Sequence, residues 1–99
     1  MDNWFLNLSE EDKSFIKRFV LASGSLKDLA EQYNVSYPTL RIRLNRLIDK
    51  ISILDDPQTK DPLRIKIQVL AAEGQISTAV ARDILKEYDK TERRRNQDE

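Results

Sequence analysis

The stretch that decides the fold is Gly24–Ile51, with the sequence GSLKDLAEQYNVSYPTLRIRLNRLIDKI. Near its start, apolar residues recur at steps of three, one and three, which places them on one helix face: Leu26, Leu29, Ala30 and Tyr33. Ser25 is expected to cap this helix, with Asp28 completing a capping box. Because asparagine tolerates a left-handed backbone, Asn34 is expected to form the turn that follows.

A second helix is expected to begin at Ser36, whose hydroxyl can accept from backbone N–H groups two or three residues on. Pro38 fits the first turn, where no N–H donor is needed. Apolar residues then recur with a period near 3.6 and form a stripe that is expected to be buried: Leu40, Leu44, Leu47, Ile48 and Ile51. Val35 is expected to fill the core between the two helices, which cross closely at the small residue Ala30. A short helix, a tight turn and a longer helix are typical of a helix-turn-helix unit that reads duplex DNA.

With that stripe buried, the arginine-bearing side of the second helix is expected to face solvent. Three side chains would contact base edges in the major groove: Tyr37, Arg41 and Asn45. Five others would position the helix on phosphates: Ser36, Thr39, Arg43, Arg46 and Lys50. Four cations against Asp49 give residues 36–50 a net charge of +3. A patch of this size predicts weak binding by one copy and a loss of affinity with salt.

Two functional hypotheses follow, because arginines on an exposed helix are also common on a plain solvated surface. The first is a small DNA-binding transcriptional regulator that acts as a homodimer. The alternative is a protein-interaction adaptor that uses the same scaffold without reading DNA sequence. The spacing of cap, turn and stripe favours the regulator. Two features support the adaptor: the exposed Ile42 and the zero net charge of the whole chain, with 17 basic and 17 acidic residues.

The composition narrows the class of protein. A chain of 99 residues supports one modest core. It contains no cysteine and no histidine, which excludes disulfides, zinc fingers and Cys or His catalytic groups within it. The Asp55–Asp56 pair has no further ligands at a set spacing, so it is interpreted as a solvated loop and no metal site is expected. No cofactor or enzyme activity is expected either, because the sequence contains no Gly-rich phosphate loop and no paired carboxylates in a plausible cleft. No apolar run approaches the roughly 20 residues of a membrane span, and no signal peptide is evident, so a cytoplasmic location is expected.

The N-terminal part is expected to complete a three-helix core. Ser9 and the acids that follow it predict a helix start. That helix should end at Gly24 and bury one face: Phe15, Ile16, Phe19 and Val20. The lead-in at residues 1–8 carries several large apolar groups and is expected to dock on the core.

The C-terminal part is expected to form a helical hairpin after a polar linker at residues 55–61. Asp61 and Pro62 are a strong helix start, although the alternation of apolar and polar residues over 63–69 also fits a strand. As a helix, this segment is apolar on two sides. One side is expected to pack on the chain's own domain, and the other on the last helix or on a second copy of the protein. The sequence therefore predicts an all-α chain: a helix-turn-helix domain at 1–54, a hairpin and dimerisation element at 62–90, and a disordered tail at 91–99.

The run from Phe15 to Ile48 resembles the bacterial family known as domain of unknown function 2089. Its most telling pieces are GSLK at Gly24–Lys27 and VSYPTLR at Val35–Arg41. The resemblance implies a helix-turn-helix fold and a regulatory role. Many members carry an N-terminal zinc ribbon, which this cysteine-free chain lacks, so nothing that the ribbon does is carried over.

Overall fold

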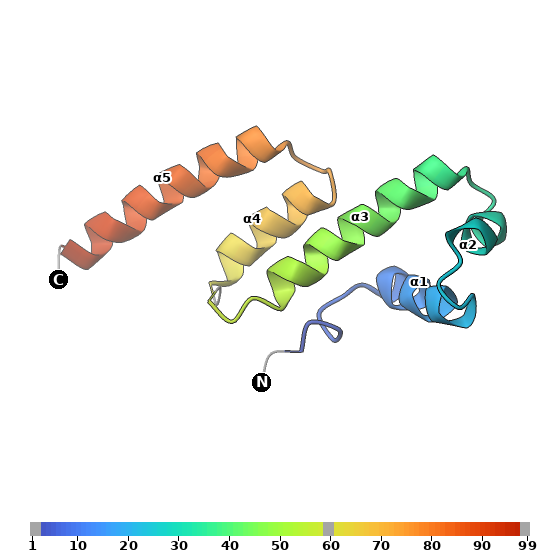
Figure 1. The fold of residues 1–99 in the computed structure, drawn as a ribbon. Helices are drawn as coiled ribbons and strands as arrows, with labels where there is room; N and C mark the ends of the chain where they lie inside the picture. Colours follow the sequence, from blue (N-terminus) through green and yellow to red (C-terminus); the bar gives the residue numbers. More distant parts are fainter. Residues whose placement is uncertain (1–2, 59–60, 98–99) are drawn as a thin grey trace. The chain divides into compact units, whose positions relative to one another are not determined.

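The structure, a computed structural model, describes residues 3–58 and 61–97 and is built from α-helices (Figure 1). Five helices span these residues: α1 (Glu10–Leu21), α2 (Leu26–Tyr33), α3 (Tyr37–Leu54), α4 (Pro62–Ala72) and α5 (Thr78–Gln97). The all-α prediction is confirmed, and the alternating segment after Pro62 is helix. The chain divides into two compact units, Met1–Asp56 and Pro57–Glu99, and the division falls in the expected linker.

Helix α1 begins where the sequence signals it. The Ser9 hydroxyl accepts a hydrogen bond from the Asp12 N–H at 3.1 Å, and three acids occupy the first turn, where they favour the positive end of the helix dipole. The helix ends before two residues with positive φ, Ser23 at 54° and Gly24 at 78°. The Gly24 N–H donates to the Phe19 carbonyl at 2.9 Å, which satisfies one of the last helical acceptors.

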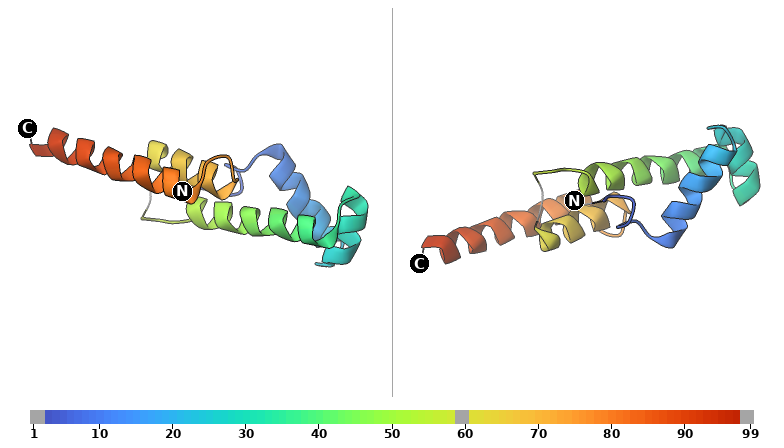
Figure 2. Two further views of the ribbon diagram at one scale, coloured as in Figure 1. Left: turned by 90° about the horizontal axis from the view of Figure 1, so that it is seen from above. Right: turned by 90° about the horizontal axis from the view of Figure 1, so that it is seen from below.

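The turn between α2 and α3 has the expected geometry. The Ser25 hydroxyl caps α2 by accepting from the Asp28 N–H at 3.2 Å. Asn34 adopts the left-handed conformation with φ 55° and ψ 45°, and the Val35 N–H then donates to the Ala30 carbonyl at 3.0 Å. The chain thereby leaves α2 and starts α3 within three residues, so α2 lies beside the beginning of α3 in all views (Figure 2).

The core of the first unit lies where the helices α1, α2 and α3 meet. Its buried members come from all three helices and from the lead-in: Leu8, Phe15, Leu29, Ala30, Leu40 and Leu47. Trp4 packs against this cluster, as expected for a docked lead-in, whereas Phe5 and Leu6 remain exposed. Leu44 and Ile51 are partly buried on the same stripe of α3.

Three residues that the apolar patterns assign to the core are exposed instead. Val20 is 66% exposed because it lies five residues beyond Phe15, which turns its side chain well away from the buried face of α1. Val35 is exposed because the left-handed Asn34 turns the chain outward just before it. Ile48 is 48% exposed because it lies at the edge of the stripe, one residue from the buried Leu47.

In the second unit, α4 and α5 run antiparallel and side by side (Figures 1 and 2). The Asp61 carboxylate caps α4 by accepting from the Leu63 N–H at 3.0 Å. Gly74, with φ 77°, lies in the turn, and the Ser77 hydroxyl accepts from the Val80 N–H at 3.0 Å at the start of α5. These residues supply the sharp reversal that an antiparallel hairpin requires.

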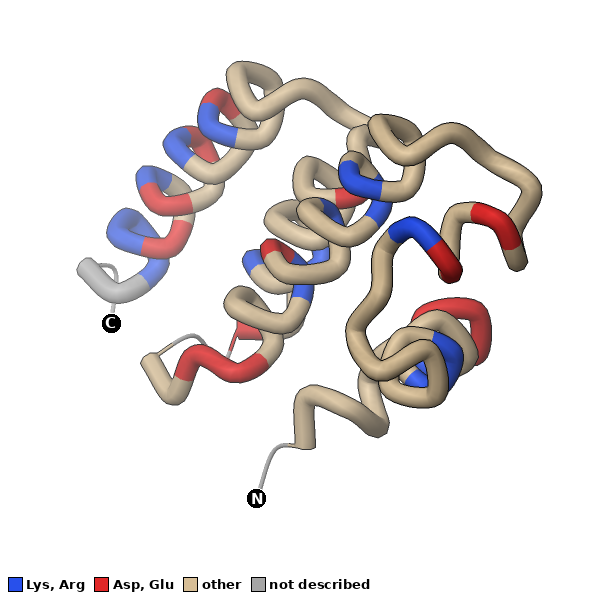
Figure 3. The backbone as a smooth tube through the Cα atoms, turned by 45° about the vertical axis from the view of Figure 1, so that its right-hand side comes forward, with Lys and Arg blue, Asp and Glu red and all other residues tan. Residues whose placement is uncertain are grey.

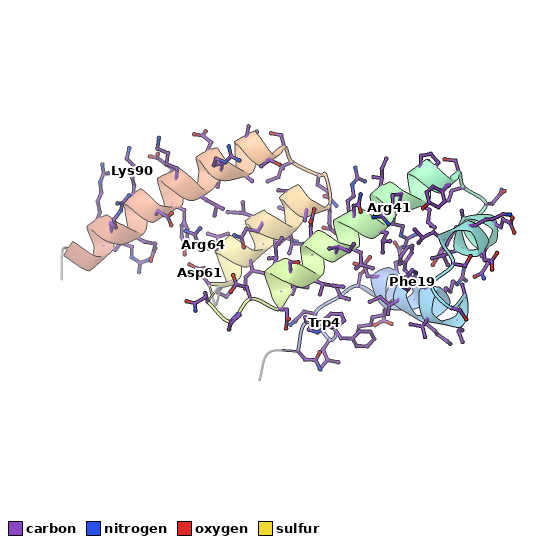
Figure 4. The ribbon with its side chains drawn as sticks, viewed as in Figure 1. Trp4, Phe19, Arg41, Asp61, Arg64 and Lys90 are labelled. Atoms are coloured by element: carbon purple, nitrogen blue, oxygen red, sulfur yellow. The ribbon has the colours of Figure 1, made fainter. Side chains whose placement is uncertain are left out.

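Two polar contacts join the start of α4 to the part of α5 that lies away from the connecting turn. The Arg64 guanidinium forms an ion pair with Asp89, and the Tyr88 hydroxyl donates a hydrogen bond to the Asp61 carboxylate. Asp61 and Arg64 lie together at the start of α4 (Figure 4). Because these contacts link residues 25 and 27 positions apart, they fix the pairing of the two helices.

The expected disordered tail is helical as far as Gln97, so that prediction is wrong for residues 91–97. Charges of both signs follow one another along α5 (Figure 3). Glu92 and Arg95 form an ion pair at 3.3 Å across one helical turn. Pairs with this spacing favour helix, which explains how so polar a segment remains helical. Residues 98–99 of the expected tail lie outside the described residues.

Candidate nucleic-acid interface

The solvent-facing side of α3 carries a row of polar side chains above the buried Leu40 and Leu47. Tyr37, Arg41 and Asn45 follow one another at intervals of four residues, so they form one ridge along the helix. All three are exposed, and Arg41 projects from the N-terminal half of α3 (Figure 4). The structure therefore brings together the three side chains that the sequence assigns to base edges.

Two of the residues that were assigned to phosphates also face solvent. Thr39 and Arg46 are exposed, and Ile42, which is 53% exposed, lies between them on the helix surface. Thr39 is partly engaged, since its hydroxyl accepts a hydrogen bond from Ser36 at 2.9 Å. Arg46 has the five N–H donors of a guanidinium available for an anionic partner.

Ser36 serves mainly as the cap of α3. Its hydroxyl oxygen accepts from the Thr39 N–H at 3.3 Å while its proton goes to the Thr39 hydroxyl. The exposed start of α3 also carries the positive end of the helix dipole and backbone N–H groups without helical acceptors. This end of the helix therefore favours an anionic group even where Ser36 itself is engaged.

Lys50 does not face solvent, so the prediction that it contacts a phosphate is wrong. Its side chain is buried, with the residue only 7% exposed, and its ammonium forms an ion pair with Asp12 of α1. The physical reason is its place on the helix: Lys50 follows the buried Leu47 by three residues and therefore shares the core side of α3. The same spacing, read from the sequence, would have placed it inside.

Arg43 also turns toward the protein. Its guanidinium lies over the Phe15 ring at 4.8 Å and over the Tyr33 ring at 5.0 Å, and Arg18 of α1 lies 5.0 Å from the same Tyr33 ring. Phe15 and Tyr33 are themselves stacked, with ring centroids 5.7 Å apart. Cation–π contacts of this kind stabilise the junction of α1, α2 and α3, so Arg43 is half-buried and is not part of the exposed ridge.

These two placements reduce the charge of the candidate interface. Of the charged residues between 36 and 50, only Arg41, Arg46 and Asp49 are exposed, so two cations minus one anion leave a net charge of +1. Figure 3 shows both signs along α3. The sequence-based value of +3 overestimated the patch, because it counted cations that the fold uses internally.

Sequence reasoning missed the partners Asp12 and Tyr33 of these two cations. The sequence predicts Asp12 to be an acid of the first helical turn, which it is, but its carboxylate also forms an ion pair with a lysine 38 residues away. No local pattern announces such a pair, because its members meet only when α1 packs on α3.

The described part of the chain holds neither a cluster of metal-ligating side chains nor a helix that could span a membrane. No group of three or more acidic side chains at 3–58 and 61–97 is arranged to hold a metal ion. No helix among these residues combines the length and apolarity needed to cross a membrane.

The comparisons agree with the helix-turn-helix geometry. Residues 8–54 match the family described as "Domain of unknown function (DUF2089)-HTH", and this range contains α1, α2 and α3. No match to the chain was found among curated proteins or among solved structures. The segment 8–54 therefore matches the helix-turn-helix domain family of unknown function 2089 that the sequence resembles.

Proposed function

We propose that the protein is a DNA-binding transcriptional regulator whose helix α3 enters the major groove. The observation that carries the proposal is the exposed ridge of Tyr37, Arg41 and Asn45 on the second helix of a helix-turn-helix unit. In such units the N-terminal half of the second helix meets the base edges, and this half holds Tyr37 and Arg41.

The side chains on the ridge suit different bases. The Arg41 guanidinium fits the two acceptors of guanine, and the Asn45 amide fits the donor and acceptor of adenine. Tyr37 contributes a hydroxyl and a flat ring at the start of the helix. Thr39 and Arg46, which lie across the exposed face of α3 from the ridge, are suited to phosphates, and the exposed carboxylate of Asp49 opposes them.

A net charge of +1 gives a single copy little attraction for the DNA backbone, so the proposal includes a homodimer that spans two half-sites. The described part of the hairpin leaves three large apolar residues exposed that a second copy would cover: Leu63, Val80 and Ile84. Sedimentation of the full chain tests this. We expect the wild-type chain to sediment as a dimer and the Ile84→Glu variant as a monomer. A wild-type chain that is monomeric at tens of micromolar (a rough working range) would contradict the homodimer.

The alternative function is an adaptor that binds a protein through the same side of α3, and the exposed Ile42 supports it. The two functions differ in what Arg41 does. In a reader of DNA it recognises a base, whereas in an adaptor it lies beside an apolar contact and its removal changes no DNA preference.

Selection of bound sequences from a random duplex pool at low salt is the experiment that separates them. We expect the wild-type chain to enrich a short motif that contains guanine, and Arg41→Ala to lose that preference. Arg94→Ala, which changes an exposed arginine of α5, should retain it. A pool from which the wild-type chain enriches no sequence would overturn the proposal and leave the adaptor function.

A further inference from the structure

An apolar groove runs between α1 and α3 on the flank of the first unit. It encloses about 160 Å³, and every side chain that lines it is apolar. Above the core residues Phe15 and Leu47, its walls come from Ile16 and Phe19 on α1 and from Leu44, Ile48 and Ile51 on α3. Phe19 is labelled on α1 in Figure 4.

The volume of the groove indicates what kind of group fits. Small-molecule and cofactor pockets usually enclose about 300–1,000 Å³ and include a few polar groups that orient the ligand. A groove of about 160 Å³ without polar lining is too small and too uniform for that use. It is suited to one or two aliphatic side chains that project from a helix.

The apolar surface continues beyond the groove itself. Ile48 forms one wall and is 48% exposed, and Val20, which follows Ile16 by one helical turn on α1, is 66% exposed. Exposed apolar surface that surrounds an apolar groove is a feature of protein interaction sites.

Positive charge borders the groove on both helices. On α3, Arg41 precedes Leu44 by three residues and Ile48 by seven, so it shares their side of the helix. On α1, the exposed Lys17 precedes Val20 by three residues. Asp12, the acid one turn before Ile16, is already neutralised by Lys50. The exposed Asp55, which follows Ile51 by four residues, places an acid at the opposite end of this side of α3. A partner with acidic residues beside its apolar anchors would therefore meet complementary charge at the end of the groove near Arg41 and Lys17.

From this shape and charge we propose that the groove between α1 and α3 binds an acidic amphipathic helix of a partner protein. Aliphatic side chains at positions i, i+3, i+4 and i+7 of that helix enter the groove beside Ile48 and Phe19. Its acidic residues then face Lys17 and Arg41. This docking goes beyond DNA binding and does not depend on it.

The test is a selection of helical peptides from a randomised display library against the full-length chain in the absence of DNA. Two variants of the same residue type on the same helix provide the comparison, Ile48→Glu in the groove and Ile42→Glu on the solvent-facing side. Both isoleucines are about half exposed, so neither change is expected to unfold the protein.

We expect the enriched peptides to be acidic, with apolar residues spaced by three and four. Ile48→Glu should weaken their binding by more than about tenfold, the effect of removing a central anchor and adding like charge, and Ile42→Glu should leave it unchanged. Peptides that are basic, or that bind Ile48→Glu as well as wild type, would overturn the proposal. So would a wild-type dimer that Ile48→Glu alone converts to a monomer, because a second copy would then fill the groove.

Discussion

At the scale of single residues, burial of the Lys50 ammonium depends on the Asp12 carboxylate beside it. Removing one member of a buried ion pair is strongly destabilising, so Asp12→Ala should lower the free energy of unfolding by about 3 kcal/mol. Replacing both, as Asp12→Leu with Lys50→Met, should cost clearly less than the single change. Urea unfolding of the three chains measures this, and an equal loss in the single and double variants would contradict the role of the pair.

Arg41 provides the residue-level test of base reading. Lysine keeps the positive charge but lacks the planar fork that bonds both acceptors of guanine. Arg41→Lys should therefore reduce the discrimination between the selected site and a site with one changed base by about 1–3 kcal/mol. Affinity for unrelated duplexes should hardly change. Fluorescence anisotropy with both duplexes at one salt concentration measures this, and unchanged discrimination would exclude Arg41 as a reader.

At the scale of elements, the connection between α2 and α3 depends on the left-handed backbone of Asn34. A β-branched residue is strained in this conformation, so Asn34→Val should destabilise the first unit by about 1–2 kcal/mol. Glycine adopts it without strain, so Asn34→Gly should be close to neutral. Thermal unfolding of the two variants provides the comparison. Equal stability of Asn34→Val and wild type would show that the turn tolerates another geometry.

The hairpin of α4 and α5 should respond to pH through Tyr88 and Asp61. The Tyr88 hydrogen bond lowers the pKa of Asp61 below its ordinary 3.8, and Asp61 in turn raises the pKa of Tyr88 from 10.0 to about 12. A lowered carboxyl pKa adds stability that is lost as pH falls below 3.8, and a raised tyrosine pKa adds stability that is lost as pH rises from 10 to about 12.

Helicity of the full chain, followed by circular dichroism between pH 2 and pH 12 (roughly the range in which these groups titrate), tests this linkage. Tyr88→Phe should remove the alkaline loss of the hairpin, whereas Tyr37→Phe, which changes an exposed tyrosine of α3, should retain it. An alkaline loss that persists in Tyr88→Phe would show that this hydrogen bond does not hold the hairpin.

Local chemistry explains which elements the sequence predicts well. The caps at Ser9, Ser25 and Ser36 and the turn at Asn34 depend on hydrogen bonds to residues within four positions, so the sequence alone determines them. The exposed ridge of Tyr37, Arg41 and Asn45 can also be predicted, because it follows from the period of 3.6 residues in a helix. The role of Lys50 could not be predicted in this way, because it depends on Asp12, which lies on another helix. The helical end of α5 could not be predicted either, because a polar, highly charged sequence is also typical of a disordered tail.

At the scale of the whole molecule, two compact units divide the chain at Asp56–Pro57. The first unit carries the candidate DNA-reading ridge on α3 and the apolar groove between α1 and α3. The second is a hairpin whose exposed apolar residues suit pairing with a second copy. Because the chain as a whole has no net charge, the proposed attraction to DNA would have to be local to α3, and the proposed homodimer would double that surface.

The most direct measurement is a titration of the isotope-labelled full chain with duplex DNA at low salt, followed residue by residue in amide NMR spectra. If α3 enters the major groove of the DNA, the largest chemical-shift changes will fall on Tyr37, Arg41 and Asn45. Lys50 and the residues of α5 will show small changes. The absence of any shift, or shifts confined to the hairpin, would contradict DNA reading by this helix.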